Sequence, residues 1–390
     1  MRVVIAGGKL QGVEACYLAR ELGWDTAVVD RDPSVPARGI ALSFCQCDIE
    51  KDREKLRKVI EEADLIIPAL ENISALKALK VQAETTGVPI AYDERSYHTS
   101  RSKKLSNRLF ARLGIPIPHP WPECGFPVIA KPSTASGSQG VRRFDSAREM
   151  NTFFKNSEEI PPGWVIQEYL EGPSYSLEVF GWKGRYETGQ ITELEMDGSY
   201  DCKRVLAPAE ISDSLAGEFE ALSLRIARGL GLNGIMDVEV IEHGGVLKVL
   251  EIDARLPSQT PSAVLHSTGI NMVELLKQIF VDGQIRPLPQ EKNGRGAVYE
   301  HIKVAEDKIE VLGEHVMSTA GPMQEVSGFF GADVGLTNFS ESRFPWVATL
   351  MITGENRKQA WQKRCRVIEK ISRYLKKGSV TSVASRRVTL

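Results

Sequence analysis

The first hundred residues alternate between short apolar runs and helix-forming stretches, and this alternation limits the possible folds more than any other feature of the chain. The runs VVIAG, TAVVD and DLIIP are separated by an amphipathic stretch at 11–22 and a charged stretch at 52–62, and the run PIAYD follows at 89–93. Short apolar strands with helices between them predict a parallel sheet that is covered on both faces. We therefore expect an α/β domain over residues 1–100.

The chain changes character after a cluster of prolines at 116–127, which ends a basic helix-forming stretch. From 126 to 256 the strands are closely spaced and alternate in polarity, which predicts antiparallel sheet with a few helices. A polar tract rich in Gly and Pro at 282–296 marks a second boundary, and a basic helix is expected near 357–374. We predict an N-terminal domain at 1–100, a central domain at 101–285 and a small C-terminal α+β domain at 286–390.

The composition excludes several classes of protein. Lys and Arg number 49 against 51 Asp and Glu, a balance that argues against nucleic acid or a membrane surface as the main partner. No apolar stretch approaches the roughly 18 residues of a membrane span, and none resembles a signal peptide. The six cysteines are too sparse for a disulfide framework, and we interpret FCQCD at 44–48 as a strand or loop and not as a zinc site. We expect a cytoplasmic protein.

The loop GGKLQG at 7–12 matches a dinucleotide-binding loop only in part. Such a loop carries Gly at its first, third and sixth positions, and the third Gly lets the backbone approach a pyrophosphate. Gly7 and Gly12 fit, but Lys9 occupies the third position, which argues against a nicotinamide cofactor. Glu71 and Asn72 follow DLIIP at the same sheet edge, where they suit either an amine-bearing ligand or a solvated loop.

An acidic β-hairpin is predicted in GIMDVEVIEHGGVLKVLEIDAR, at 234–255. Glu251 and Asp253 point to the same face, and Glu239 falls nearly opposite them, with the register open by one residue. Three carboxylates on one face repel one another without a cation, and oxygen ligands suit Mg²⁺. The alternative to a metal site is a hairpin with one solvent-exposed face, on which Glu239 has no ligand.

A basic strand precedes this hairpin in FPVIAKPSTASGSQGV, at 126–141. Lys131 ends an apolar strand and a Gly/Ser loop follows, an arrangement that brings a positive charge and free backbone amides to a phosphate chain. No G-K-[ST] follows the glycines, so this is not a Walker loop, and a flexible hairpin is the alternative. The strand WVIQEYLEG comes next, and by itself its sequence is typical of an edge strand.

The order of these elements resembles the ATP-grasp superfamily. The resemblance implies an ATP-grasp fold of mixed α/β and α+β class, with a Rossmann-like domain before the ATP-binding unit and a small C-terminal domain after it. The stretches GGKLQGVEA, GIMDVEVI, EIDARLPSQTP and STGINMVELL are together similar to ligases of pyrrolysine biosynthesis, which join 3-methyl-D-ornithine to L-lysine. Related purine-pathway enzymes usually carry Asn at the position of Asp253 and lack the SQTP continuation. The resemblance therefore implies an ATP-dependent, amide-forming ligase with small-molecule substrates.

The same resemblance assigns roles in the ATP site. Many relatives hold the ribose with a Glu where this chain has Ser174, which leaves the ribose contacts open. The implied residues are Lys104 (or the adjacent Lys103), Lys131, Ser136, Gly137 and Ser138 for the phosphates; Gln167, Glu168, Tyr169 and Leu170 for adenine; Glu239, Glu251 and Asp253 for Mg²⁺, with two ions expected; and Arg255, with Lys131, for the reacting groups.

Both amino-acid substrates carry two amines and a carboxylate, so we expect a cavity rich in acids and hydrogen-bond partners. Asp201 is equally compatible with a solvated hairpin tip, Glu178 with a partner for a phosphate-binding lysine, and His301 is expected to be a core histidine. The expected substrate-contacting residues are Lys9, Leu10, Gln11, Glu71, Asn72, Glu178, Asp201, Arg255, Ser258, Gln259 and Thr260.

Other functions remain open at this stage. Within the superfamily, a carboxylating purine-pathway enzyme or a D-alanine-type dipeptide ligase is the main alternative. An NAD-binding oxidoreductase is disfavoured by Lys9, and a non-catalytic nucleotide-binding protein by the complete set of three carboxylates, two lysines and Arg255. We consider a homodimer, although the sequence does not determine the oligomeric state.

Overall fold

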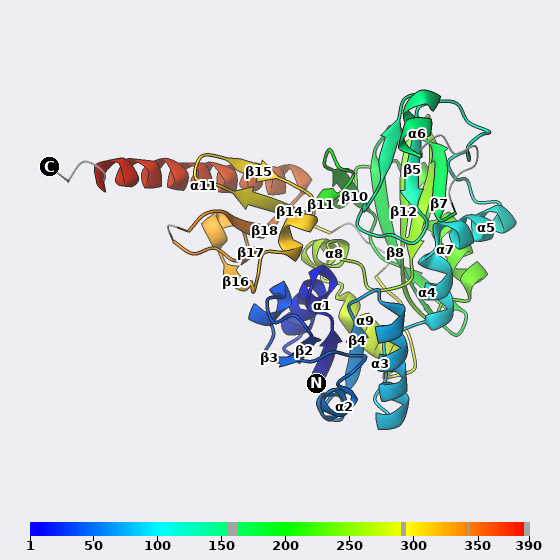
Figure 1. Ribbon diagram of the computed structural model, residues 1–390, viewed down its shortest axis with the longest axis horizontal. Coiled ribbons are helices and arrows are strands. Elements are labelled where there is room, and N and C mark those ends of the chain that lie inside the picture. Colours follow the sequence, from blue (N-terminus) through cyan, green and yellow to red (C-terminus); the bar gives the residue numbers. More distant parts are fainter. Residues whose placement is uncertain (155–161, 290–293, 342, 386–390) are drawn as a thin grey trace.

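The computed structural model describes residues 1–154, 162–289, 294–341 and 343–385 of the chain. Figure 1 shows the N-terminal sheet at the bottom, the central strands at the upper right, and the C-terminal helix α11 (Arg357–Ser385) projecting to the left. Within these ranges no helix is both long and apolar enough to cross a lipid bilayer.

The N-terminal sheet is parallel, as the alternation predicts. Its strand order is β3 (Ser43–Gln46), β2 (Asp25–Asp30), β1 (Arg2–Ala6) and β4 (Leu65–Pro68). Helix α1 (Leu10–Glu21) connects β1 to β2, α2 (Arg53–Ile60) connects β3 to β4, and α3 (Ile73–Thr86) follows β4. Apolar clusters fill both faces of this sheet, which explains the continuous apolar runs of its strands.

The run PIAYD does not form the strand that we predicted. Only Ile90 makes an isolated parallel bridge, to Ile66 on β4. The chain turns immediately afterwards because Asp93 caps the next helix, α4 (Glu94–Ser100), where its carboxylate accepts a hydrogen bond from the N–H of Ser96 at 3.0 Å.

The glycines of GGKLQG serve close backbone packing. Gly7 has φ +108°, and a Cβ added there would lie 2.3 Å from the carbonyl oxygen of Ala69, just after β4. A Cβ on Gly12 would lie 2.2 Å from the carbonyl oxygen of Gly7. Glycine at both positions therefore lets the loop lie against the carboxyl end of the sheet.

A long antiparallel sheet forms the rest of the scaffold. Pairing of β11 with β14 places Leu206 opposite Val298, so the sheet runs without a break across the predicted boundary at 285. The domain limits therefore remain a proposal. The strand order is β13 (Val246–Asp253), β12 (Gly234–His243), β8 (Ser174–Trp182), β10 (Thr192–Met196), β11 (Cys202–Ala207), β14 (Gly296–Val304), β18 (Trp346–Gly354), β17 (Val334–Thr337) and β16 (Gln324–Ser327), with β9 (Arg185–Thr188) beside β8 and β15 (Ile309–Val311) beside β14.

A separate antiparallel sheet lies beside the acidic hairpin (Figure 1). It consists of β6 (Arg142–Phe144), β5 (Val128–Pro132) and β7 (Trp164–Glu168). The remaining described helices are α5 (Lys103–Leu113), α6 (Ala147–Phe153), α7 (Asp213–Leu230), α8 (Thr260–Thr268), α9 (Met272–Phe280), α10 (His315–Ser318) and the 3₁₀ turns η1 (Pro36–Gly39) and η2 (Phe329–Gly331).

Two long helices cover this scaffold with apolar faces. Phe219 and Ile226 of α7 are fully buried in the core that contains Val238 of β12. Val367 and Ile371 of α11 are buried against the strands of the C-terminal part. Their spacing of seven and four residues follows the helical repeat, because only one stripe of each helix faces the core.

Candidate active site

Three cavities meet around the Gly/Ser loop between β5 and β6. The hinge cavity, of about 390 Å³, lies between the small sheet and the acidic hairpin. The central cavity, of about 170 Å³, lies at the end of the hairpin, and the N-terminal cavity, of about 470 Å³, faces the loop at 7–12. Ser136 and Gly137 line all three cavities, so this loop forms the partition between them.

The hinge cavity gathers the residues predicted for adenine and ribose. The main-chain N–H of Glu168 donates to the carbonyl of His119 at 2.9 Å, and its carboxylate pairs with Lys248, so neither of these Glu168 groups is open to a ligand. The resemblance implies main-chain groups of Glu168 and Leu170 as the partners of adenine, and this assignment stays a proposal in which the N–H of Glu168 is not the donor. The lining includes Ile129, Lys131, Gln167, Glu168, Tyr169, Leu170, Ser174 and Leu250.

Lys103, and not Lys104, reaches the cavities. The ammonium group of Lys103 lies 2.9 Å from the carboxylate of Glu251 and donates to the carbonyl of Ala135 in the Gly/Ser loop. Lys104, the next residue on α5, is exposed and is absent from the described lining of all three cavities. Successive helical residues point about 100° apart, so only one of the pair can face the site. We therefore move the proposed phosphate contact from Lys104 to Lys103.

Lys131 enters the hinge cavity from β5. Burial lowers the pKa of its ammonium group, and the positive charge of Lys103 lowers it further, against the opposing effect of Glu251. Two partly buried cations that repel each other favour an anion between them. The arrangement suits a phosphate chain.

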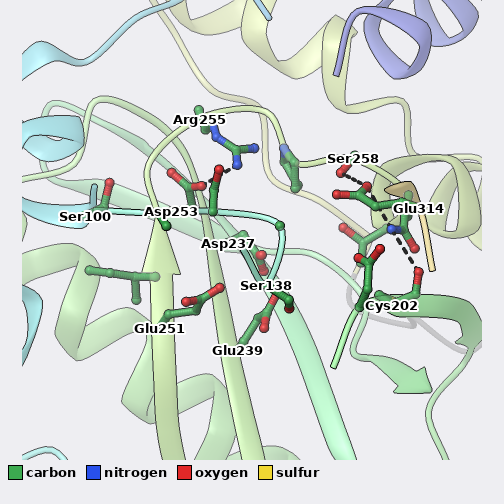
Figure 2. Close-up of a pocket in the computed structure, with 18 of the residues that line it drawn as sticks. Ser100, Ser138, Cys202, Asp237, Glu239, Glu251, Asp253, Arg255, Ser258 and Glu314 are labelled. Carbon is green, nitrogen blue, oxygen red and sulfur yellow. Dashed lines mark hydrogen bonds and ion pairs between the residues drawn. The ribbon is translucent and has the colours of Figure 1, made fainter. Parts of the chain in front are cut away.

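The carboxylates of the acidic hairpin share one face, as the alternation along the strands predicts. Glu239 of β12 lies directly opposite Glu251 of β13, and Asp237 lies opposite Asp253, with a bulge after Glu239. Our sequence analysis missed Asp237, although its position two residues before Glu239 on the same strand predicts the same face. Figure 2 shows these four carboxylates along the hairpin, with Arg255 at its end.

The pKa values of the hairpin carboxylates are shifted in different directions. Burial, together with the charges of Glu251 and Asp237, raises the pKa of Glu239 well above its ordinary value. Burial acts in the same direction on Glu251, but Lys103 and Lys131 outweigh it, so that the pKa of Glu251 is lowered. Burial raises the pKa of Asp253 to about 6, although the charge of Arg255 opposes the shift.

These residues fit a hard divalent cation by their donor set. All are carboxylates, Oδ1 of Asp253 is buried without a partner, and Glu239 has no counter-cation within 4.0 Å in the described ranges. Among the described residues, the ligand atoms of Asp197, Asp201 and His315 lie within 4.8 Å of one another, whereas those of the hairpin carboxylates lie further apart. The hairpin carboxylates lie apart because Glu251 pairs with Lys103 and Asp253 pairs with Arg255.

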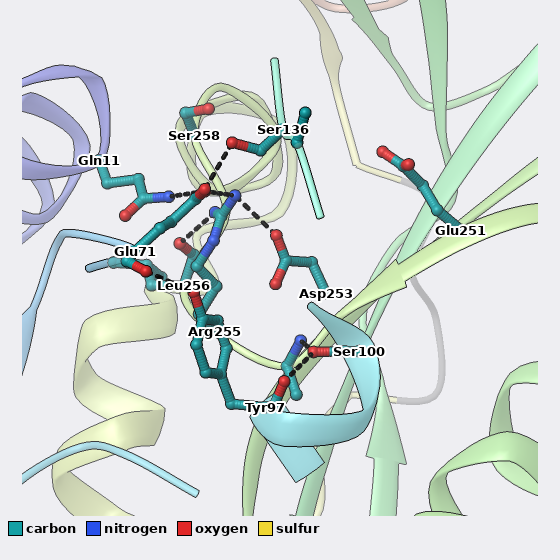
Figure 3. Close-up of polar contacts among 12 residues, drawn as sticks. Gln11, Glu71, Tyr97, Ser100, Ser136, Glu251, Asp253, Arg255, Leu256 and Ser258 are labelled. Atoms are coloured by element: carbon teal, nitrogen blue, oxygen red, sulfur yellow. Dashed lines mark hydrogen bonds and ion pairs between the residues drawn. The ribbon is translucent and has the colours of Figure 1, made fainter. Parts of the chain in front are cut away.

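Arg255 is the centre of a polar network that joins the Gly/Ser loop to the N-terminal sheet. Its guanidinium lies 2.6 Å from both Glu71 and Asp253. The hydroxyl of Ser136 donates to the second oxygen of Glu71, and the amide of Gln11 donates to the first at 3.3 Å. Figure 3 shows Glu71 enclosed by these three donors. The three contacts of Glu71 therefore join residues 60 to 184 positions apart in the sequence.

The N-terminal cavity brings together the other residues predicted from the loop edges. Lys9, Leu10, Gln11, Glu71 and Asn72 all line it, and Asn72 also caps α3 by accepting from the N–H of Ala75 at 2.9 Å. The cavity is rich in acids, since its lining also includes Asp30, Asp48, Glu50, Asp201 and Glu314.

The SQTP stretch after Arg255 binds another carboxylate, which the sequence analysis missed. The hydroxyl of Ser258 and the amide of Gln259 donate to Oε2 of Glu314, at 2.7 and 2.9 Å. Glu314 lies just before α10, far along the chain, and nothing in its neighbours GEHV sets it apart. Gln259, with φ +75°, turns the chain into α8.

Asp201 and Glu178 are both buried, so neither side chain is solvated. Asp201 is 5% exposed and accepts from the N–H and from Nδ1 of His315, at 3.0 and 2.5 Å. Glu178 is fully buried and accepts from the hydroxyl of Thr260, not from a lysine. Burial raises the pKa of Glu178 to about 7.

His301 lies in the core, as expected. It is 2% exposed, its Nδ1 lies 2.9 Å from the hydroxyl of Thr349, and burial lowers its pKa to about 3.

Glu14 of α1 is a further buried carboxylate, and it contacts the first turn of α8. Its Oε1 accepts from the N–H of Ser262 at 2.6 Å, and burial raises its pKa from 4.5 to about 7. The folded protein thus keeps the proton of Glu14 over a pH range in which the unfolded chain has released it. The free energy of unfolding falls as the pH rises through this range.

Replacing Glu14 by Gln is expected to stabilise the protein at pH 8, by up to about 3 kcal/mol, and to have little effect near pH 4.5. Urea unfolding of both proteins at several pH values measures the difference. The exposed Glu84 of α3 provides a matched control, because Glu84→Gln is expected to change stability by less than about 0.5 kcal/mol. A gain for Glu14→Gln that does not depend on pH would contradict the assignment.

Comparisons with known proteins agree with this geometry. The family model for the ATP-grasp domain matches residues 101–259. A 3-methyl-D-ornithine–L-lysine ligase from Methanosarcina acetivorans is 34% identical over 366 residues, which cover 93% of this chain and 95% of that protein. The ligase of the same name from Methanosarcina mazei is 36% identical and covers 92% of both chains. The crystal structure of a biotin carboxylase β,γ-ATP complex from Campylobacter jejuni has a TM-score of 0.72, with 15% identity over 95% of this chain and 91% of that one.

The hinge cavity, paired lysines and acidic hairpin therefore belong to an ATP-grasp enzyme, a ligase that joins a carboxylate to an amine and binds ATP. Within this superfamily, the extent and level of identity show that the chain belongs to the family of the 3-methyl-D-ornithine–L-lysine ligases.

Proposed function

We propose that the protein joins the carboxylate of (3R)-3-methyl-D-ornithine to the ε-amine of L-lysine, through an acyl phosphate, in the biosynthesis of pyrrolysine. The observation that carries this proposal is the acid-lined N-terminal cavity, which is lined by Arg255 and shares Ser136 and Gly137 of the Gly/Ser loop with the hinge cavity. Two diamino acids bring four ammonium groups and two carboxylates, and the acids of the cavity lining outnumber its cations Lys9, Arg31 and Arg255, which matches the net positive charge of the substrates. The names of the relatives support the same substrates.

The first half-reaction must activate a carboxylate, because its oxygen is a poor leaving group. We assign Lys103 and Lys131 to the ATP phosphates, where they neutralise charge as the γ-phosphoryl group moves to the ornithine carboxylate. Glu239, Glu251 and Asp253 would hold Mg²⁺, two ions in our proposal, which neutralises phosphate charge and orients the transferred group. Arg255 can offer two parallel N–H donors to the acyl phosphate once substrate displaces Glu71.

The second half-reaction, attack of the amine on the acyl phosphate, needs a site from which water is excluded. An acyl phosphate hydrolyses if water reaches it, and the loop at 134–140 lies where it can exclude water from all three cavities. Hydrogen bonds from Ser136 to Glu71 and from Ser138 to the carbonyl of Tyr200 hold the loop over the central cavity. We infer that this loop is the lid. A homodimeric assembly remains a prediction.

The test is ADP release by the purified protein with Mg·ATP, L-lysine and D-ornithine or its 3-methyl derivative, with each component omitted in turn. The proposal expects release that requires both amino acids, together with an amide-linked product of the corresponding mass. Release that instead responds to bicarbonate or D-alanine would replace the substrate assignment with a purine-pathway or dipeptide-ligase activity. No ADP release under any of these conditions would contradict the ligase assignment for this chain.

A further inference from the structure

The amide-forming step requires a proton acceptor that the ATP site does not supply. The ε-amine of lysine enters as an ammonium group and must lose a proton before its nitrogen can attack. Several carboxylates that line the central cavity already neutralise a cation or bind a histidine: Glu71 and Asp253 pair with Arg255, and Asp201 accepts from His315. These carboxylates already have a charged or hydrogen-bonding partner, so they are less available to an incoming ammonium group.

Glu314 differs from them in its partners. Its Oε2 accepts hydrogen bonds from two neutral groups, the Ser258 hydroxyl and the Gln259 amide. Over the ranges that the structure describes, no Lys or Arg side chain lies within 4.0 Å of the Glu314 carboxylate. One oxygen is thus fixed in place, and the carboxylate forms no ion pair, although the more distant charge of Arg255 partly stabilises it. This combination suits a positioned base.

The position of Glu314 also suits a base for the amine substrate. It lines both the central and the N-terminal cavity, as Arg255 does. Its other oxygen, Oε1, lies 3.9 Å from the point where a Cβ on Gly137 of the lid would sit, so this oxygen is directed to the space beneath the lid. Figure 2 shows Glu314 beside Ser258, on the opposite side of the cavity from the hairpin carboxylates. An amine bound there approaches an acyl group on Arg255 from the side away from the phosphates.

We propose that Glu314 is the catalytic base of amide formation, an assignment that rests on the ligase function proposed above. Oε1 binds the ε-ammonium group of the amine substrate and takes one proton from it. The neutral nitrogen then forms a bond to the acyl carbon, the bond from that carbon to the phosphate oxygen breaks, and the departing phosphate takes the second nitrogen proton. Atoms and charge balance, and Glu314 returns its proton to solvent when the lid opens.

The environment of the carboxylate supports this assignment. Burial raises the pKa of Glu314 above its ordinary value, although the hydrogen bonds from Gln259 and Ser258 oppose the shift. A higher pKa makes the carboxylate a stronger proton acceptor. The same residues of the SQTP stretch that fix Oε2 directly follow Arg255, so one segment positions both the acyl-binding group and the base.

Hydroxylamine separates the role of a base from a structural role. It is uncharged at neutral pH, so it attacks an acyl phosphate to form a hydroxamate without needing a base. We expect Glu314→Gln to lower the rate of amide formation with lysine by about 10²- to 10⁴-fold, while D-ornithine hydroxamate forms at the wild-type rate. Raising the pH is expected to restore part of the amide rate, because more of the lysine is then neutral. Glu310→Gln, on β15 and outside the three cavities, is the matched control and should leave both rates unchanged.

Two results would overturn the inference: an unchanged amide rate in Glu314→Gln, or equal losses of amide and hydroxamate in this variant. Glu314→Asp guards against misfolding, since it keeps the carboxylate and is expected to retain more amide activity than the Gln variant. If the wild-type protein forms no ornithine-dependent hydroxamate, the acyl phosphate itself is absent. That outcome removes the proposed function, and the inference with it.

Discussion

Replacing Glu251 by Gln is expected to reduce ADP formation by about 10³-fold. Glu251 lies at the centre of the acidic face, opposite Glu239 and 2.9 Å from the ammonium group of Lys103. The substitution removes a negative charge at nearly constant volume, so it weakens Mg²⁺ binding and leaves Lys103 without its partner. Metal assistance is worth several kcal/mol of barrier, and about 1.4 kcal/mol corresponds to a factor of ten in rate.

The measurement is ADP release over a range of Mg²⁺ concentrations, with thermal unfolding as a check on the fold. The apparent Mg²⁺ requirement should rise in Glu251→Gln. Glu242 lies on the same hairpin but contacts Tyr175 and lines none of the three cavities, so Glu242→Gln is expected to behave as wild type. Unchanged turnover of Glu251→Gln at every Mg²⁺ concentration would contradict the metal assignment.

The second large effect is expected from Lys103→Met, which should lower the rate of ADP formation by about 10²- to 10³-fold and raise the KM for ATP. Lys103 is the lysine of α5 that reaches both the hinge and the central cavities. Loss of one preorganised donor to developing negative charge typically has an effect of this size. Met keeps the length and apolar stem of the side chain, so the change isolates the charge.

Lys104→Met is the internal control for this prediction. The two lysines are adjacent on one helix, but the side chain of Lys104 is exposed, and its replacement is expected to change the rate less than about twofold. Steady-state kinetics of both variants with ATP varied give the comparison. If Lys104→Met showed the larger loss, the lysine originally favoured by the sequence pattern would be the phosphate ligand, and the arrangement described above would be incorrect.

The lid and the substrate network are linked through Glu71. This carboxylate binds Arg255 and accepts from Ser136 of the Gly/Ser loop, so the same residue contacts the proposed acyl-binding arginine and the proposed lid. A substrate carboxylate that takes its place on Arg255 changes the contacts of the loop at the same time. Substrate binding and lid movement are therefore expected to be coupled, since both depend on where Glu71 lies.

Local patterns determined much of the architecture. The period of apolar runs in the first hundred residues predicted a parallel sheet, because strands buried on both faces must be apolar throughout. Alternation along the hairpin predicted that Glu239, Glu251 and Asp253 share a face, because side chains of a strand point to alternate sides. The same rule covers Asp237, and applying it one step further would have found this residue. These features depend only on neighbours in the chain.

The tertiary structure decided what depends on distant contacts. It selected Lys103 over Lys104, because the orientation of α5 against the hairpin determines which lysine faces the cavity. It joined the C-terminal strands to the central sheet through β11 and β14, and so brought Glu314 to the SQTP stretch 55 residues earlier. Hydrogen bonds and ion pairs act over a few ångströms in space regardless of separation in sequence. Residues such as Glu314 and Glu71 acquire their roles only when the folded chain places their partners beside them.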